Sequence, residues 1–202
     1  MITYPEANYV RDFSAELAEN TKGLPLYKPT RRPLYRRGLE VDYTKAKHAY
    51  ALNATLLYDP QQNPQSVLLN GPSEAAQILL VERASGHGVI GSFSGVTGYI
   101  DTVHSPDPKK NPGVPFDPIA YTLKDEFVTE CDFTDESFSL VEFYAGKLTV
   151  EDRTITPGAK ISVVPILGLC TQKPEISVNK KELLSSKWVD LHDVKHTEQL
   201  AR

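Results

Sequence analysis

The chain has 202 residues, enough for one well-filled core with a small appendage. Its hydrophobic fraction of 40%, charged fraction of 24% and formal net charge of -4 are ordinary for a globular protein. The mild acidity argues against a nucleic-acid binder, and no apolar stretch approaches the roughly 20 residues that cross a bilayer. The two cysteines, Cys131 and Cys170, show no CxxC spacing, which argues against a disulfide framework or a thiolate zinc site. We therefore expect a cytoplasmic protein that contacts neither nucleic acid nor membrane.

Residues 1–45 differ in composition from the rest of the chain. They include a stretch rich in proline, tyrosine and arginine, GLPLYKPTRRPLYRRGLEV. Such a stretch favours an extension that packs on the main domain or on a second subunit, and the alternative is a patch that faces phosphate. We predict an N-terminal extension over 1–45, a main domain over 46–202 and a possible homodimer.

The first half of the main domain has the pattern of strands. AYALNATLLY at 49–58 and AQILLVER at 76–83 are apolar and rich in β-favouring residues, and a long polar connection joins them. The five glycines of GHGVIGSFSGVTGYID at 86–101 predict a strand and tight turns where the backbone approaches a ligand or another strand. The proline-rich segment 102–117 that follows predicts an exposed loop.

A helix is predicted to begin after Asp117 and to run to about Cys131. Asp117 suits the N-cap and Pro118 the first helical position, and Asp132 lies where the C-cap should be. The pattern predicts an apolar stripe of Ile119, Leu123, Phe127 and Val128. It places four polar residues on the other side of the helix: Asp125, Glu126, Thr129 and Glu130.

The remainder of the chain predicts further strands over 137–146, 147–156 and 160–171. A short strand at WVDL and a final helix over 190–202 follow. An order of strands, helix, strands, helix favours an α+β fold or a mixed-sheet sandwich over a regular βαβ array.

Glu126 and Glu130 are four residues apart, so on a helix their carboxylates share a face. Acid pairs at this spacing are also common on solvated helices. Here a glycine-rich segment precedes the helix, and carboxylate oxygens with backbone carbonyls are the ligands that Mg²⁺ or Mn²⁺ prefers. The spacing therefore supports two hypotheses, a metal-binding face and a solvated acidic face.

The run from Gly98 to Phe133 resembles the signature of the Nudix hydrolases. That signature reads Gly, five residues, Glu, seven residues, Arg-Glu, an aliphatic residue, any residue, Glu-Glu, any residue, Gly and an aliphatic residue. This chain keeps the spacing, with Asp117, seven residues, Asp125-Glu126, Phe127, Val128, Thr129-Glu130, Cys131, Asp132 and Phe133. The gap from Gly98 to Asp117 is longer by about thirteen residues, which indicates an insertion in the proline-rich loop.

The resemblance covers roughly residues 49–195 and implies a Nudix-like α/β/α sandwich with a mixed sheet. It implies Mg²⁺- or Mn²⁺-dependent hydrolysis of a nucleoside diphosphate linked to another moiety. By this analogy the catalytic residues are Glu126 and Glu130. The metal ligands are these two glutamates with Glu182 and the backbone at Gly98. The substrate-binding residues are Arg83 and Asp101, and the alternative for Arg83 is a surface ion pair.

Three departures from the signature bear most directly on activity. Asp125 replaces its arginine, so an ion pair with the acid at Asp117 cannot form. Thr129 replaces the first member of the Glu-Glu pair, and Asp132 replaces the glycine. These departures keep an alternative open: a catalytically impaired Nudix-like domain that binds a nucleotide or a protein partner.

Overall fold

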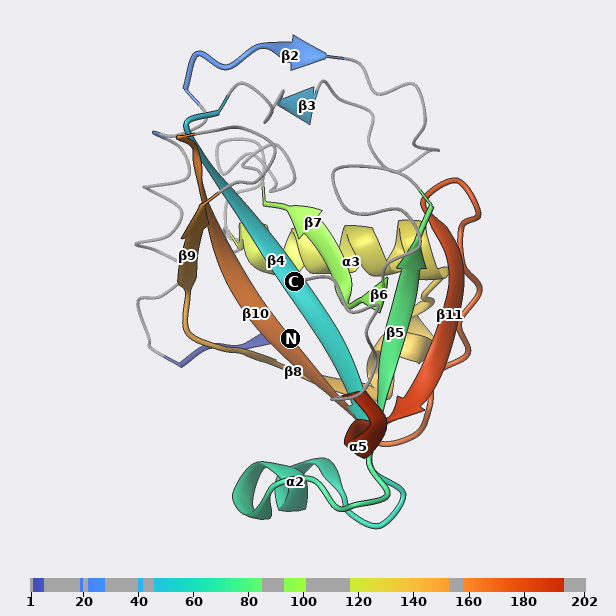
Figure 1. The fold of residues 1–202 in the computed structure, drawn as a ribbon. Coiled ribbons are helices and arrows are strands. Elements are labelled where there is room, and N and C mark those ends of the chain that lie inside the picture. Colours follow the sequence, from blue (N-terminus) through green and yellow to red (C-terminus); the bar gives the residue numbers. More distant parts are fainter. Residues whose placement is uncertain are drawn as a thin grey trace.

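The computed structural model describes residues 2–5, 19, 22–27, 40–41, 46–84, 93–100, 117–152 and 158–194. Figure 1 shows the arrangement of their helices and strands. In chain order these elements are β1 (Ile2–Thr3), β2 (Leu26–Tyr27), β3 (Glu40–Val41), β4 (His48–Tyr58), α2 (Pro64–Asn70), β5 (Gln77–Arg83), β6 (Phe93–Ser94), β7 (Val96–Tyr99), α3 (Pro118–Cys131), α4 (Asp135–Ser139), β8 (Val141–Ala145), β9 (Thr149–Asp152), β10 (Lys160–Cys170), β11 (Leu183–Asp190) and α5 (Leu191–Val194).

Within the described residues, nine strands form one mixed sheet whose main order is β1-β8-β10-β4-β5-β11. The two long strands β4 and β10 are parallel over their full length and form its centre. The antiparallel partner of β10 changes along the strand, from β9 to β8. Pro165 lies at this change and its carbonyl accepts a hydrogen bond from the Gly146 N–H at 2.7 Å, a position that suits a residue without an N–H.

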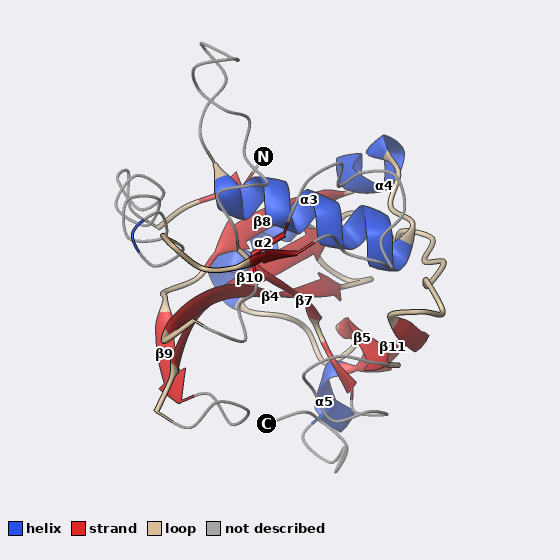
Figure 2. Cartoon of the chain, turned by 90° about the horizontal axis from the view of Figure 1, so that it is seen from above, coloured by secondary structure: helices blue, strands red, loops and turns tan. Residues whose placement is uncertain are grey.

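The two faces of the sheet carry separate hydrophobic clusters. Alternation along β5 places Leu79 and Val81 in the cluster under α3, whereas Ile78 and Leu80 belong to the cluster on the opposite face. The helices α3 and α4 lie on the first face, and α2 and α5 contribute to the second (Figure 2). The predicted α+β sandwich with a mixed sheet is confirmed.

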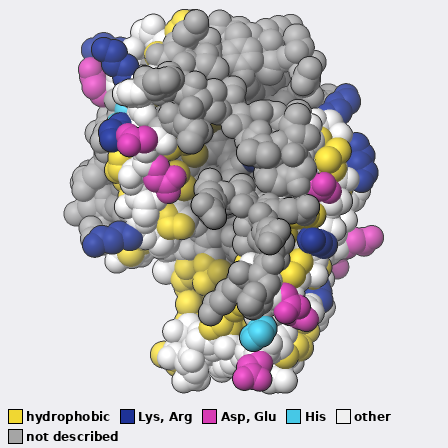
Figure 3. All heavy atoms as spheres, viewed as in Figure 1, with side chains coloured by type: hydrophobic (Ala, Val, Ile, Leu, Met, Phe, Trp, Pro, Cys, Tyr) yellow, Lys and Arg dark blue, Asp and Glu magenta, His cyan; other side chains and the backbone are white. Residues whose placement is uncertain are grey.

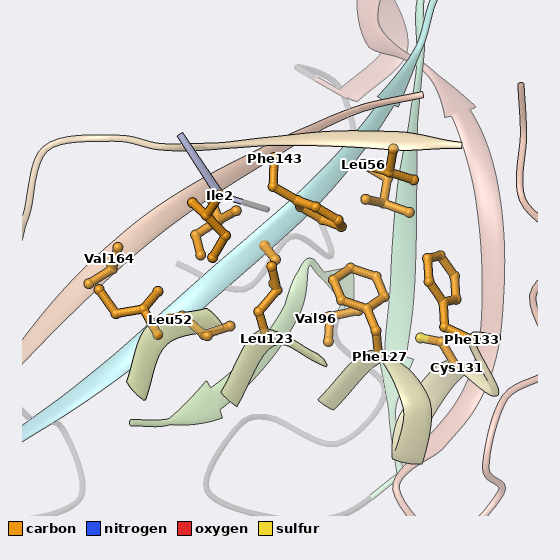
Figure 4. Packing of buried hydrophobic residues seen from close by; sticks show 14 of the residues in the cluster. Ile2, Leu52, Leu56, Val96, Leu123, Phe127, Cys131, Phe133, Phe143 and Val164 are labelled. Atoms are coloured by element: carbon orange, nitrogen blue, oxygen red, sulfur yellow. The ribbon is translucent and has the colours of Figure 1, made fainter. Parts of the chain in front are cut away.

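The apolar side of α3 anchors the helix to the sheet. Phe127 is fully buried, and its ring centroid lies 4.7 Å from that of Phe133 and 5.9 Å from that of Phe143. Figure 4 shows Leu123 and Phe127 of the helix pointing toward Leu52 and Phe143 of the sheet. This packing fixes the rotation of α3, and therefore which of its polar residues face the strands.

The first strand, β1, belongs to the main sheet although it lies inside the predicted extension. Ile2 pairs in parallel with Phe143 of β8, and its side chain is buried in the cluster under α3. β2 and β3 form a separate two-stranded sheet. The extension as a unit over 1–45 stays a prediction.

Three elements differ from the sequence-based prediction. The polar connection before β5 contains α2, which Asn63 caps by accepting a hydrogen bond from the Ser66 N–H at 2.9 Å. The strand predicted over 137–146 is wrong in its first part, because Thr134 and Ser137 form a capping box that begins α4 at Asp135. The short strand predicted at WVDL is the eight-residue β11.

The helix α2 projects from the end of the sheet (Figure 1). Its side chains Leu68 and Leu69 are exposed. Figure 3 shows further hydrophobic side chains on this face next to the projecting end. Among the described residues, no helix has the length and apolar character needed to cross a membrane.

Candidate metal centre

The helix α3 begins and ends where its capping residues predict. The Asp117 side chain accepts a hydrogen bond from the Ala120 N–H at 2.9 Å, and Pro118 is the first helical residue. Asp132 adopts a left-handed conformation with φ 57°, and its N–H donates to the carbonyl of Phe127. The prediction of a helix from after Asp117 to Cys131 is confirmed.

Glu126 and Glu130 are buried, with exposed fractions of 1% and 3%. Of the two hypotheses for this pair, the burial argues against a solvated acidic face. The reason for the burial is that β7, which pairs with β4 in the main sheet, packs against the helix, so α3 is covered on more than its apolar stripe. The helical pattern alone could not show this, because it describes one apolar face and treats carboxylates as exposed.

Gly98 of β7 lies directly against the Glu126 side chain. A Cβ atom at position 98 would lie 2.4 Å from Oε1 of Glu126 and 2.5 Å from its Cγ, closer than unbonded atoms can approach. Only glycine allows this contact between the β7 backbone and the carboxylate. The structure thus brings together two of the predicted metal-site positions from separate elements.

The two glutamates form a concentrated negative site. One oxygen of each carboxylate, Oε2, is buried and makes no hydrogen bond, although both residues make other interactions. Two carboxylates one helical turn apart repel each other, and their burial is costly unless a cation or a proton neutralises them. The arrangement is chemically suited to a cation.

The nearby thiol of Cys131 does not add a thiolate to this site. Burial, with further contributions from the negative charges of Glu130 and Glu126, raises the pKa of Cys131 far above its usual value. The thiol is therefore protonated at neutral pH, and the carboxylate oxygens are the available donors. An all-oxygen donor set fits Mg²⁺ or Mn²⁺ better than a thiophilic metal.

For the remaining predicted site residues, no described contact connects the side chain to Glu126 or Glu130. Glu182 lies in the turn before β11, where its carbonyl accepts a hydrogen bond from the Ala84 N–H at 3.0 Å. Arg83 ends β5 opposite Leu183, and Asp101 lies outside the described residues. In the described ranges, no group of three or more His, Cys, Asp or Glu residues is placed to hold a metal. The roles of Glu182, Arg83 and Asp101 stay predictions.

The contact between Tyr4 and Asp117 was not predicted from the sequence. The Tyr4 hydroxyl lies 2.7 Å from both side-chain oxygens of Asp117, the residue that caps α3. Asp117 therefore has a tyrosine partner where the signature would supply an arginine. The residues are 113 positions apart, and no local sequence signal connects them.

Thr129, which replaces a glutamate of the signature, directs its hydroxyl to the helix backbone. The Oγ1–H donates to the carbonyl of Asp125 at 2.7 Å. This is the usual bond of a threonine within a helix, and it leaves Thr129 with only a neutral oxygen to offer a cation.

Of the comparisons with known proteins, the one with solved structures bears on the fold. No family model matches the sequence, and no curated protein sequence matches it. Among solved structures, the NUDIX domain of Shewanella oneidensis NrtR complexed with ADP ribose is 13% identical, with 76% of this chain and 79% of that chain covered and a TM-score of 0.50.

Two further solved structures are similar at lower scores. A C. elegans Ap4A hydrolase in a binary complex is 14% identical, covers 73% of this chain and 84% of its own, and has a TM-score of 0.42. The E. coli dihydroneopterin triphosphate pyrophosphohydrolase is 13% identical, with coverages of 70% and 80% and a TM-score of 0.44. At such identities a likeness concerns the fold alone.

Proposed function

We propose that this chain, which has the Nudix fold predicted from its signature, is a divalent-metal-dependent hydrolase of a nucleoside diphosphate linked to another moiety. The observation that carries the proposal is the burial of Glu126 and Glu130 side by side on α3, with Gly98 of β7 against Glu126. Two buried carboxylates next to the backbone of a neighbouring strand are oxygen donors of the kind that hold Mg²⁺ or Mn²⁺.

In the proposed centre, Glu126 and Glu130 hold the cation, together with Glu182 and the backbone carbonyl at Gly98. When bound, the cation neutralises charge on the diphosphate and makes a water molecule more acidic. Water adds to one phosphorus, the bridging P–O bond breaks, and Glu126 or Glu130 accepts the proton that the water loses. Arg83 and Asp101 contact the substrate in this proposal.

The rigid setting of α3 supports this chemistry. The helix is clamped to the sheet through Phe127 and capped at both ends, so its carboxylates need little reorganisation when charge develops on the substrate. The substrate class agrees with the ligand of the NrtR NUDIX domain, ADP ribose, which is a nucleoside diphosphate linked to a sugar.

A second function is favoured by the departures from the signature. Thr129 contributes no carboxylate and donates its hydroxyl proton to the Asp125 carbonyl. With fewer charges the centre would bind a cation more weakly, and the chain would then act as a nucleotide-binding sensor or a protein-interaction module. We rank the hydrolase first because Glu126 and Glu130 are retained and buried together.

The test is a hydrolysis assay with a panel of nucleoside diphosphate compounds in Mg²⁺ or Mn²⁺. Removal of one carboxylate by Glu130→Gln should lower the metal-dependent rate by about 100-fold or more. Glu136→Gln on α4 is the matched control, because Glu136 is an exposed glutamate outside the site, and it should keep the full rate. Nucleotide binding without turnover would support the second function, and the absence of both would overturn the two proposals.

The proposed setting is the cytoplasm, and the proposed assembly is a homodimer. Both cysteines, Cys131 and Cys170, are free and buried, which suits a reducing compartment. The composition of residues 1–45 supports the homodimer, and light scattering of the purified chain tests it.

A further inference from the structure

The helix α2 presents two neighbouring leucines to solvent at the projecting end of the molecule. Val67 of this helix is buried, whereas Leu68 is 46% exposed and Leu69 is 84% exposed. α2 projects from the end of the sheet (Figure 1), so both leucines lie away from the core under α3. Scattered exposed leucines are ordinary, and a contact surface requires that the pair belong to a larger apolar patch.

Such a patch continues from α2 onto the sheet. Val67 packs in the hydrophobic cluster on the second face of the sheet, and Tyr144 and Leu167 are half-buried side chains that pack against the same cluster. These two residues lie opposite each other in the register of β8 and β10. Figure 3 shows hydrophobic side chains on this face next to the projecting end. We call Leu68, Leu69, Tyr144 and Leu167 the tip surface.

The segment around α2 carries no charge. Residues 60–73 contain no Asp, Glu, Lys or Arg, although these residues make up 24% of the chain. The segment is instead rich in amides, which can both donate and accept hydrogen bonds: Gln61, Gln62, Asn63, Gln65 and Asn70. A charged partner would therefore find no charge of opposite sign on α2.

A neutral surface of this kind is complementary to a copy of itself. In a dimer with a two-fold axis the same patch faces itself, so charges near the axis would meet like charges. Leucines and amides avoid this conflict, because leucine packs on leucine and one amide can donate to another. The charge pattern thus favours a second copy of this chain as the occupant of the tip surface.

The helix α2 is also ordered before any partner binds. The Asn63 side chain caps its start, and at its end the Gly71 N–H donates to the carbonyl of Val67 at 2.9 Å. An element that is already ordered loses less conformational entropy on association. Specific dimers bury roughly 800 Å² on each partner, more than seven helical residues offer, so the contact must extend to Tyr144 and Leu167.

We propose that the tip surface is the dimer interface of this protein, with α2 of each copy packed on the tip surface of the other. The inference rests on the homodimer of the proposed function and names the surface that forms it. It does not depend on the metal centre.

The test is sedimentation equilibrium of the full chain, which measures the dissociation constant of the dimer. Leu69→Asp and Leu69→Lys should each raise this constant by about 100-fold or more, because a charge of either sign would be buried beside its own copy. Leu69 is exposed, so both variants should keep the wild-type melting temperature, which circular dichroism checks.

The matched controls are two other exposed apolar residues outside the tip surface. Leu184 on β11 is 42% exposed and Val150 on β9 is 59% exposed. Leu184→Asp and Val150→Asp add the same charge elsewhere on the molecule, so they should leave the dissociation constant unchanged.

The outcomes separate this inference from the rest of the proposed function. A dimer that persists at the wild-type dissociation constant in either Leu69 variant, or that the control variants weaken equally, would overturn the role of the tip surface while the homodimer stands. A wild-type chain that stays monomeric up to its solubility limit would overturn the homodimer and this inference with it, whatever the hydrolysis assay shows.

Discussion

Gly98 lies so close to the Glu126 side chain that position 98 has no room for a side chain of its own. In Gly98→Ala the new methyl group would meet both Oε1 and Cγ of Glu126 within 2.5 Å. Because Glu126 is buried, its side chain cannot swing into solvent, and the strand or the helix must move. We expect the free energy of unfolding to fall by about 1 to 3 kcal/mol, measured by urea denaturation.

The control for this prediction is a second substitution at the other side of the contact. Glu126→Ala removes the atoms that the new methyl group would meet, so Gly98→Ala should cost less in that background. An equal cost in both backgrounds would show that the strain has another source.

Tyr4 and Asp117 give a second prediction at the residue scale. Tyr4→Phe removes a hydroxyl that donates to a partly buried carboxylate, and that carboxylate also caps α3. Bonds to charged groups are stronger than neutral ones, so we expect unfolding to require about 1 to 2 kcal/mol less. Urea denaturation measures the difference.

Tyr144→Phe is the matched control. Its hydroxyl also donates to a carboxylate at 2.7 Å, but that bond, to Glu142, is exposed. The loss there should be below about 0.5 kcal/mol. Similar losses in the two variants would contradict a specific role for Tyr4.

The residues that could be predicted from the sequence were those with local signals. Asp117 was recognisable as a cap, and Glu126 and Glu130 as a pair on one helical face, because both patterns lie within a few residues. Tyr4 could not be found this way. Its partner lies 113 positions away, and only the folded sheet brings the two together.

At the scale of elements, Asp59 holds the segment that contains α2. Its carboxylate accepts hydrogen bonds from the Gln61 N–H at 2.9 Å, from the Ser73 N–H at 2.7 Å and from the Ser73 hydroxyl at 2.8 Å. A longer bond of 3.3 Å comes from the Gln62 side chain. Both ends of the connection around α2 are thereby tied to one buried carboxylate.

These bonds make the stability of the α2 segment depend on pH. Burial alone would raise the pKa of Asp59, but hydrogen bonds, led by that from the Ser73 N–H, outweigh burial and lower the pKa below its usual value. The stabilisation is therefore complete above the ordinary aspartate pKa of about 3.9 and is lost as the pH falls through the lowered value in the folded state.

Asp59→Asn should lower the free energy of unfolding at pH 7 by about 1 to 3 kcal/mol, since buried donors lose a charged acceptor. The difference from the wild type should shrink as the pH falls below about 4, where the wild-type carboxyl also becomes neutral. Urea denaturation at both pH values tests this, and a difference that stays constant with pH would contradict the assignment.

The helices differ in how well they could be predicted from the sequence. α3 was predictable because it has strong caps, sufficient length and an apolar stripe. α2 has only seven residues within a polar stretch, too few to show a helical period. α4 overlaps the segment 137–146 that is predicted as a strand, but the capping box formed by Thr134 and Ser137 begins a helix there.

At the scale of the whole molecule, the fold was predictable from the order of its elements and the kept spacing of the signature. The structural likeness at 13% identity shows how little of the sequence that fold requires. The burial of Glu126 and Glu130 was not predictable, because it depends on β7 lying against α3. Fold alone does not settle activity, so the function depends on the measured chemistry of that site.

The parallel pairing of β4 with β10 also has a consequence for how the chain reaches its structure. In the register of these two central strands, His48 lies beside Lys160 and Tyr58 beside Cys170. During synthesis, about half of the chain is therefore made between β4 and its parallel partner β10. The helix α3 leaves the ribosome before the sheet on which it packs is complete. Closing so long a loop is slow, so we expect folding times of milliseconds or longer.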